Sequence, residues 1–521
     1  MVFANYSENR YKTKSIIFLI MLPFLVFSQN IDELFSNSGE IYFSFSFKNI
    51  NELNELSKII SIDHKTDYEK AYAYANRSEF SKFLNFGISY DIIGEKVDKS
   101  FFNNSNRSNW DYYPSYSEYS NMMQAFEDSF PSICKLHNIG TLNSGHEILI
   151  LQISDNIGTI ENEPSFLYTS TMHGNELTGY VLMLRLADEI LNGYGVNPRY
   201  TNIINEVDIW INPLANPDGT YNNGDTIQMP SRYNFNNVDL NRNFPGPIQG
   251  DHPDGNEWQD ETIFFMNLAD SVKFDIGCNI HSGAEVFNYP WDMWSNLTAD
   301  DEWWQYVGRS FADTIHANSS NYFNSFDNGI TNGAQWYEIH GGRQDFMNYF
   351  KFCREFTLEM SNEKIPNPDD LPLLWNYNKN SLINFIEQSL FGLRGIVTDS
   401  ISGQPISAKV EIISHDIDSS HVYSKLPVGN YHRYLFEGNY DVTFSKSGYY
   451  SKTVNKDIYA NFATNLDVKL VPLSVNNSME VKIPRTVVNS YDVLGRPSKN
   501  KNSLLIEVYN DGTVKKTINN E

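Results

Sequence analysis

The chain has 521 residues, more than one hydrophobic core usually fills, so two to four domains are expected. Its apolar content of 41% and aromatic content of 14% exclude a largely disordered protein. A formal net charge of -25 without any basic run excludes nucleic acid as a partner, because phosphate binding needs clustered Lys and Arg; such a charge favours cationic peptides.

Residues 1–28 have the pattern of a signal peptide. Basic residues within 10–14 precede the apolar run 16–27, which is too short to span a bilayer but suits the apolar part of an export signal. Cleavage is expected between Ser28 and Gln29. The alternative, a buried core helix, lacks any amphipathic surroundings. The chain is therefore expected to be exported, with no transmembrane segment.

Residues 30–100 alternate between strand and helix periodicity in the order strand, helix, strand, strand, helix, strand. This order predicts a small α+β domain. The Asn- and Ser-rich stretch 101–110 has the composition of a linker.

Residues 112–392 alternate apolar strands with helical segments. Examples are a strand at 166–171 before a helix at 177–191, and a strand at 207–212. The predicted fold class is α/β, with a mixed, mostly parallel sheet between helices on both faces.

Residues 395–472 consist of short alternating strands and predict a β-sandwich. The tail, residues 475–521, is Asn- and Lys-rich at first and then predicts a pair of short strands with an Asp-Gly turn. Cys134, Cys278 and Cys353 allow at most one internal disulfide, and no C-x-x-C pattern is present. Any metal must therefore be bound by His, Asp or Glu.

His173 and Glu176 lie three residues apart at the end of an apolar strand, a spacing that lets both side chains bind one metal ion. Alone the pattern is weak, and polar residues between a strand and a helix would explain it equally. Two further apolar strands carry His281 and Glu359 at their ends. Because the carboxyl ends of parallel strands converge on one crevice, these four side chains are expected to meet.

Two imidazoles and one carboxylate would bind zinc and leave a fourth position for a water molecule, whose pKa falls to about 7. Glu359 would then act as the general base; the alternative is a surface carboxylate on an edge strand. Arg232, Asn241 and Arg242 offer donors for an oxyanion and for a substrate carboxylate. Turn asparagines and solvated arginines are the alternative there.

These residues lie in ordered sequence blocks that resemble the zinc metallocarboxypeptidases, and more narrowly the branch of carboxypeptidases N, E, D and M. The blocks are TMHGNE, NPLANPDG, VDLNRNFP, NIHSGAEVFNYPWD, GITNGAQWYEIHGGRQDF and TLEM. The resemblance implies one Zn²⁺ per chain, bound by His173, Glu176 and His281, and a catalytic role for Glu359. For the substrate it implies these residues: Arg232 at the carbonyl oxygen, Asn241 and Arg242 at the terminal carboxylate, and Tyr337 closing over the peptide.

That branch removes C-terminal Arg or Lys through an acidic residue that corresponds to Asp292, with Gln344 lining the same pocket. The alternative for Asp292 is a helix or turn cap after Pro290. Arg343 and Phe346 depart from the residues expected beside this pocket.

The resemblance also extends beyond the catalytic segment. Residues 395–472 are similar to the transthyretin-like domain of that branch, and residues 475–521 resemble the sorting domains of type IX secretion. The N-terminal 110 residues depart from the branch but are similar to inhibitory pro-segments of other metallocarboxypeptidases. Either a cover of the active site that is removed by cleavage in 101–110, or an ordinary accessory domain, would fit.

Together these patterns predict a secreted or cell-surface zinc carboxypeptidase that releases C-terminal Arg or Lys from peptides or proteins and meets the secretion machinery through its tail. One alternative is a peptidase of the same fold that acts on peptidoglycan stem peptides. Another is a non-catalytic binding protein, which the presence of His173, Glu176, His281 and Glu359 argues against.

Overall fold

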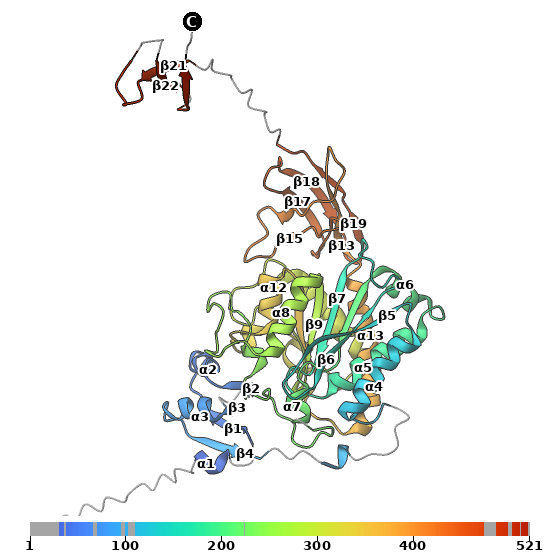
Figure 1. Ribbon diagram of the computed structural model, residues 1–521. Helices are drawn as coiled ribbons and strands as arrows, with labels where there is room; N and C mark the ends of the chain where they lie inside the picture. Colours follow the sequence, from blue (N-terminus) through green and yellow to red (C-terminus); the bar gives the residue numbers. More distant parts are fainter. Residues whose placement is uncertain are drawn as a thin grey trace, which may run out of the picture.

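The computed structural model describes residues 31–35, 38–65, 70–94, 99–102, 110–222, 224–473, 486–498, 503–510 and 512–518. The predicted signal peptide and its cleavage position lie outside the described residues, as does the greater part of the predicted linker. The chain runs from a small N-terminal domain through a large α/β domain to β-rich units (Figure 1).

The N-terminal domain is a four-stranded antiparallel sheet in the order β2-β3-β1-β4 with two main helices. Its elements are α1 (Ile31–Leu34), β1 (Glu40–Ser46), α2 (Ile50–Ser57), β2 (Ser61–Lys65), β3 (Lys70–Asn76), α3 (Arg77–Leu84) and β4 (Tyr90–Ile93), followed by η1 (Lys99–Phe102). Alternate residues of β1 point to one face, so Phe43 and Phe45 pack against Phe83 of α3. Strand β2 lies at the edge of the sheet.

The central domain contains an eight-stranded sheet in the order β11-β10-β12-β9-β7-β8-β6-β5. Its strands are β5 (Cys134–Thr141), β6 (Glu147–Ile153), β7 (Ser165–Ser170), β8 (Asp208–Asn212), β9 (Ile276–His281), β10 (Ala284–Tyr289), β11 (Ile330–Asn332) and β12 (Arg354–Ser361). The neighbours β8, β7, β9 and β12 are parallel, whereas β5, β6 and β10 add antiparallel pairs. The predicted α/β class with a mixed, mostly parallel sheet is confirmed.

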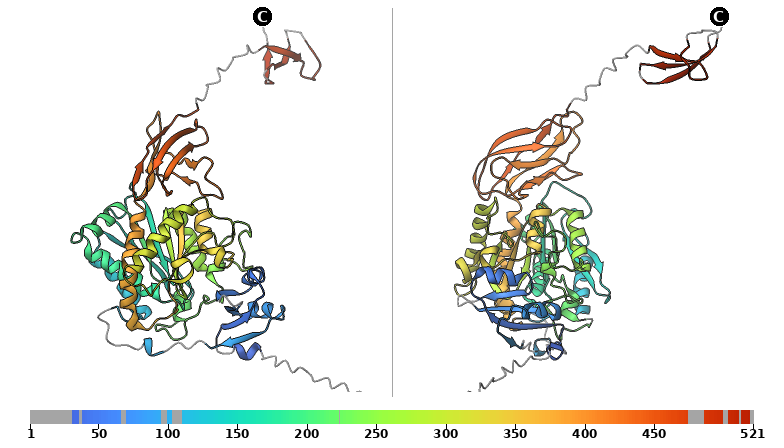
Figure 2. Two further views of the ribbon diagram at one scale, coloured as in Figure 1. Left: turned by 180° about the vertical axis from the view of Figure 1, so that it is seen from behind. Right: turned by 90° about the vertical axis from the view of Figure 1, so that its left-hand side faces the viewer.

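Helices cover both faces of this sheet (Figure 2). They are α4 (Tyr116–Ser129), α5 (Thr178–Gly193), α6 (Pro198–Glu206), α7 (Pro217–Tyr221), η2 (Leu240–Arg242), α8 (Asp260–Val272), α9 (Asp301–His316), α10 (Ser325–Asn328), α11 (Gly333–Trp336), α12 (Arg343–Phe350), η3 (Pro368–Asp370) and α13 (Leu371–Gln388). Successive residues of β7 serve different cores: Phe166 and Tyr168 pack with α5 and α13, whereas Leu167 packs with α8 and α12. Every residue of β7 is buried, as expected for a central parallel strand.

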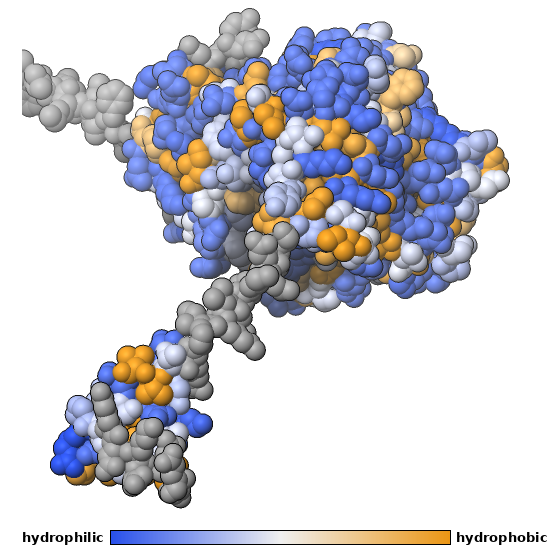
Figure 3. All heavy atoms as spheres, turned by 90° about the horizontal axis from the view of Figure 1, so that it is seen from above, coloured by the Kyte–Doolittle hydropathy of each residue, from blue (hydrophilic) through white to orange (hydrophobic). Residues whose placement is uncertain are grey.

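A β-sandwich follows, in which one sheet has the order β16-β13-β19 with β20 paired to β13, and the other has the order β15-β14-β17-β18. The strands are β13 (Gly392–Asp399), β14 (Lys409–Ile412), β15 (Val422–Tyr423), β16 (Asn430–Arg433), β17 (Gly438–Ser445), β18 (Lys452–Ile458), β19 (Ala463–Asn465) and β20 (Val468–Leu470). Seen from above, the surface is mostly polar with scattered hydrophobic patches (Figure 3).

The tail folds as three antiparallel strands, β21 (Val487–Tyr491), β22 (Leu504–Tyr509) and β23 (Val514–Ile518). The prediction of only two strands there was wrong, because the polar residues of β23 carry little hydrophobic signal.

In the described part of the chain, no helix combines the length and apolar character that a membrane crossing requires. Cys134, Cys278 and Cys353 are buried and unpaired.

Candidate metal centre and substrate cavity

The turn that follows β7 positions the first two candidate ligands. Residues 171–177 lie between β7 and α5, and the backbone N–H of Glu176 donates to the carbonyl of His173 at 3.0 Å. Thr171 adopts a positive φ of 60°, a strained conformation typical of functional sites. Gly174 allows close packing, because a Cβ there would lie 2.2 Å from the backbone of Gly219. The H-x-x-E pattern therefore forms a tight turn ahead of the helix.

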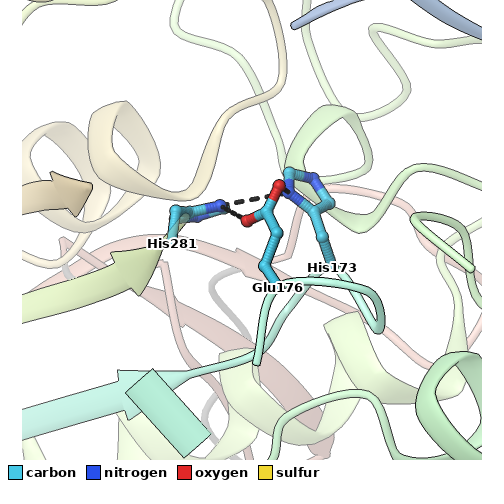
Figure 4. A group of neighbouring side chains, drawn as sticks. All are labelled: His173, Glu176 and His281. Atoms are coloured by element: carbon cyan, nitrogen blue, oxygen red, sulfur yellow. Dashed lines mark hydrogen bonds and ion pairs between the residues drawn. The ribbon is translucent and has the colours of Figure 1, made fainter. Parts of the chain in front are cut away.

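His173, Glu176 and His281 meet as predicted, with ligand atoms all within 4.8 Å of one another (Figure 4). Nδ1 of His173 lies 3.0 Å from Oε1 of Glu176, and Nδ1 of His281 lies 2.8 Å from Oε2. The two Nδ1 atoms are 3.1 Å apart. Each of the three side chains is 2% exposed.

This cluster fits a zinc ion. Ligand atoms about 2.0–2.1 Å from a tetrahedral zinc ion lie roughly 3.3 Å from one another, close to the separations found here. Burial lowers the pKa of His281 to about 4, so this imidazole is neutral at physiological pH, as a metal ligand must be. Burial would raise the pKa of Glu176, but His173, Lys364 and His281 outweigh it and hold that pKa well below its usual range. The carboxylate is therefore ionised and ready to bind a cation.

Two residues that the sequence patterns did not reveal orient the imidazoles. Nε2 of His173 lies 3.0 Å from Oδ1 of Asp239, and the side-chain amide of Asn279 lies 2.8 Å from Nε2 of His281. Asn279 precedes His281 by two residues on β9, so both point to the same face. Such outer contacts fix the ring that a metal ligand presents.

Arg232 lies beside the metal cluster. Its Nε donates to Oδ2 of Asp239 at 3.0 Å, and its Nη1 is 3.5 Å from Oε1 of Glu176. Burial would lower the pKa of Arg232, but the carboxylates of Asp239 and Glu176 raise it well above its usual value. A permanently charged donor thus lies next to the ligand set.

Glu359 lies on β12, directly opposite His281 of β9 in the parallel register. Strand β12 runs between β9 and β10, so the alternative of a surface carboxylate on an edge strand is wrong. Burial and the adjacent carboxylate of Glu176 raise the pKa of Glu359 well above its usual value. Its Oε2 is buried and has no hydrogen-bond partner within the described residues.

A cavity of about 30 Å³ joins the metal cluster to the other predicted substrate residues. It has room for about two water molecules, far less than a peptide needs. Among the groups that line it is Arg242, 7% exposed, whose Nε and Nη2 have no hydrogen-bond partner in the part of the chain described. Oδ1 of Asn241 accepts from the backbone N–H of Arg343 at 3.0 Å.

Asp292 also lines this cavity, whereas Gln344 does not and contacts Asp292 from outside it. Nε2 of Gln344 donates to Oδ1 of Asp292 at 2.9 Å, and Nδ2 of Asn288 donates to the same oxygen at 3.1 Å. Burial raises the pKa of Asp292 to about 6. The backbone N–H groups of Asp292 and Met293 both donate to Asp345, at 2.9 Å each, so Asp345 fixes the segment that carries Asp292.

The two departures from the expected pocket residues have a structural explanation. Arg343 turns away to form a fully buried ion pair with Glu355, at 3.1 Å, and its guanidinium lies over the ring of Phe265. Phe346 packs against Phe244 in the core between the sheet and α8. Neither side chain lines the cavity beside Asp292.

The N-terminal domain contacts residues at and beside this cavity through its edge strand β2, whose Asp63 also lines it. The hydroxyl of Tyr337 donates to the carbonyl of Ile62 at 2.9 Å. Ser61 donates to Oδ2 of Asp239 at 2.5 Å, and Asp63 lies 2.8 Å from Nζ of Lys364. Tyr337, which was predicted to close over the substrate, is therefore contacted by this domain, as are Asp239 and Lys364, which contact the metal ligands His173 and Glu176.

Comparisons with known proteins agree with this geometry. The family model described as zinc carboxypeptidase matches residues 119–381. Carboxypeptidase SOL1 of Arabidopsis thaliana is 34% identical over 360 residues, covering 67% of this chain and 70% of that protein. Carboxypeptidase D of Mus musculus is 32% identical over 402 residues, covering 74% of this chain but only 29% of that longer protein.

The solved structures include a similar fold. Carboxypeptidase A from Helicoverpa armigera superimposes with a TM-score of 0.53 at 18% identity, covering 67% of this chain and 97% of that one. At this identity the likeness supports the fold alone.

Proposed function

The chain belongs to the zinc carboxypeptidase family, and on that premise we propose that it hydrolyses the C-terminal peptide bond of peptides or proteins and releases Arg or Lys. The observation that carries this proposal is the guanidinium of Arg242, which is buried beside the metal cluster with two unpartnered donors. A buried donor without a partner is costly, and a guanidinium fork matches a carboxylate with two parallel hydrogen bonds. A peptide's terminal carboxylate is the complementary group.

His173, Glu176 and His281 would hold the zinc ion, which when bound acts as a Lewis acid that activates a water molecule and polarises the substrate carbonyl. Glu359 takes up a proton during attack and returns it to the leaving amine, a role that suits a carboxyl group with a raised pKa. Arg232 donates to the carbonyl oxygen as it gains charge.

Asn241 and Arg242 hold the terminal carboxylate, and Tyr337 donates to the substrate once its hydroxyl leaves Ile62. Asp292, supported by Gln344 and Asp345, would pair with the cationic side chain of the released residue. An uncharged side chain would leave this buried carboxylate without a counter-charge, which supports selection for Arg or Lys.

Zinc analysis combined with amino-acid release tests this proposal. Peptides that differ only in the last residue are incubated with the metal-loaded protein before and after Asp292→Ala. We expect Arg and Lys to be released fastest by the unaltered protein and this preference to disappear in the variant. Surviving preference would refute the role of Asp292, and no release from any peptide would refute the activity.

The N-terminal domain, predicted as residues 30–100, is proposed to cover the active site until the connection to the catalytic domain is cut. Support comes from the contacts of Ser61, Ile62 and Asp63 and from Glu40, which accepts hydrogen bonds from the backbone N–H groups of Arg232 and Tyr233 at 3.1 and 3.3 Å. A protease site engineered into residues 103–109 allows intact and cut protein to be compared. Equal rates would instead favour an accessory domain.

Export is proposed from the two ends of the chain. Residues 1–28 would be removed as a signal peptide, residues 395–472 would serve as a transthyretin-like accessory domain, and residues 475–521 would direct type IX secretion. Mass spectrometry of the protein recovered from the medium of a bacterium with that route tests this. A mature chain that starts at Gln29 is expected, and a variant that lacks residues 475–521 should remain in the periplasm.

A further inference from the structure

Lys364 lies in the loop after β12 and reaches the metal cluster. Its Nζ is 2.8 Å from Oε1 of Glu176, 2.8 Å from Oδ1 of Asp63 and 3.3 Å from the carbonyl of Ser282. The side chain is 14% exposed. The ammonium group therefore lies at the edge of the catalytic site, on the side of the metal ligands.

Asp63 lies on the extended strand β2, and its side chain reaches Lys364. A peptide bound in a cleft has the same extended conformation. Strand β2 is the edge of the N-terminal sheet, and Asp63 lines the same cavity as His173 and Glu359. Its second oxygen, Oδ2, accepts from the hydroxyl of Tyr42 at 3.0 Å. An acidic side chain on an extended segment thus already occupies the position next to this ammonium.

The backbone around this ion pair leaves room for a carboxylate. Gly283 has a φ of +133°, and a Cβ added there would lie 3.1 Å from Nζ of Lys364 and 3.5 Å from Oδ1 of Asp63. Any larger residue at position 283 would enter the space that the two charged groups share. Glycine keeps that space open.

The charges favour an anionic occupant when the N-terminal domain is absent. Glu176 would share its negative charge with a bound divalent ion, so that less of it would face Lys364. Without Asp63, the ammonium would face the part of the cavity that Asp63 now lines, with Glu176 as its remaining carboxylate partner. A largely buried cation gains most from a hydrogen-bonded counter-charge.

We propose that Lys364 forms a subsite for an acidic residue on the N-terminal side of the scissile bond, and that Asp63 fills this subsite when the N-terminal domain covers it. The proposal rests on the proposed function: the terminal residue would lie toward Arg242 and Asp292, so the preceding residues pass the metal ligands and Lys364. The preferred substrates are then peptides with Asp or Glu shortly before a C-terminal Arg or Lys.

Peptides ending in Arg test this subsite, with Glu, Gln or Lys placed at one upstream position at a time. The full chain, cut at a protease site engineered into residues 103–109 and loaded with zinc, is assayed for kcat/KM. We expect about a tenfold preference for Glu over Gln at one position, the size expected of a charge-assisted hydrogen bond. Lys364→Met should abolish it, Lys364→Glu should reverse it in favour of an upstream Lys, and Lys364→Arg should keep it.

Lys135→Met is a matched control, because Lys135 is a solvent-exposed partner of Glu127 at a distant edge strand. It should leave the preference unchanged. Zinc content and the unfolding midpoint of each variant separate loss of the subsite from loss of the metal or fold. Cleavage of every peptide without a Glu preference, or a preference that survives Lys364→Glu, would overturn the subsite alone. If no peptide is cleaved at all, both the proposed function and the subsite that rests on it are refuted.

Discussion

The N-terminal domain and the β-sandwich both contact the catalytic domain, but through different kinds of interaction. The N-terminal domain bonds to groups that have a second use: Tyr337, Asp239 and Lys364. The sandwich instead shares a closed ionic network, in which Arg433 pairs with Asp300 at 2.8 Å and Asp300 pairs with Arg354 at 2.8 Å. We propose that the first contact is exchanged for substrate, whereas the second joins buried charges of two domains and is structural.

The largest effect is expected when the sandwich contact is broken. Asp300→Ala removes the carboxylate partner of the buried Arg354 and leaves the fully buried Arg433 with Asp416 alone. We expect a loss of about 3–5 kcal/mol in the free energy of unfolding, measured in urea. Asp327→Ala, which removes the exposed partner of Arg309, is the control and should cost less than about 1 kcal/mol. Equal losses would mean that the network is not a structural anchor.

Zinc affinity is expected to depend on Asn279 of the catalytic domain and only weakly on Ser61 of the N-terminal domain. Asn279→Ala removes the group beside Nε2 of His281 and should weaken zinc affinity roughly 10- to 100-fold in chelator competition. Ser61→Ala should leave the affinity little changed, because Asp239 keeps its bonds to Arg232 and His173. A comparable loss in both variants would show that the covering domain is part of the metal site.

The ion pair between Asp63 and Lys364 is expected to restrain the activity of the uncut protein. In uncut protein, Asp63→Ala removes a charge-assisted hydrogen bond to Lys364 and should raise activity about tenfold by weakening the docked state. Asp91→Ala changes an exposed acidic residue of the same domain and should have no such effect. Unchanged activity in Asp63→Ala would mean that this ion pair does not restrain the enzyme.

The smallest effect is a pH dependence at Asp292. With its pKa raised to about 6 by burial, Asp292 is ionised above pH 6, so kcat/KM for an Arg-ended peptide should halve near pH 6 and fall further below it. Stability should change in the opposite sense: the native state holds this proton more tightly than the unfolded chain, so ionisation of Asp292 costs stability as pH rises from about 4 to about 6. Asp292→Asn should remove the step at pH 6. A parallel decline for a Leu-ended peptide would assign it to another group.

The sequence predicted the metal cluster because its members lie at the ends of apolar strands, where topology gathers side chains at one edge. His173, His281 and Glu359 met for this reason, although long segments separate them. Asn279 could also have been found, since it shares a strand face with His281.

The rest depended on contacts that leave no local signal. Lys364 and Asp63 belong to different domains, and no periodicity connects an edge strand to a loop that follows a distant strand. Arg343 departed from the expected pocket pattern in the sequence, but its buried partner Glu355 follows from packing and not from spacing. The third strand of the tail was missed because a small, polar, exposed sheet lacks alternating apolar residues.

The unpaired cysteines described above bear on how the chain reaches its folded state. Burial raises the pKa of all three thiols, so few thiolates are available to oxidants or to one another. Folding therefore needs no thiol oxidase and no disulfide isomerase. In the native protein all three thiols should therefore resist alkylation until the chain unfolds.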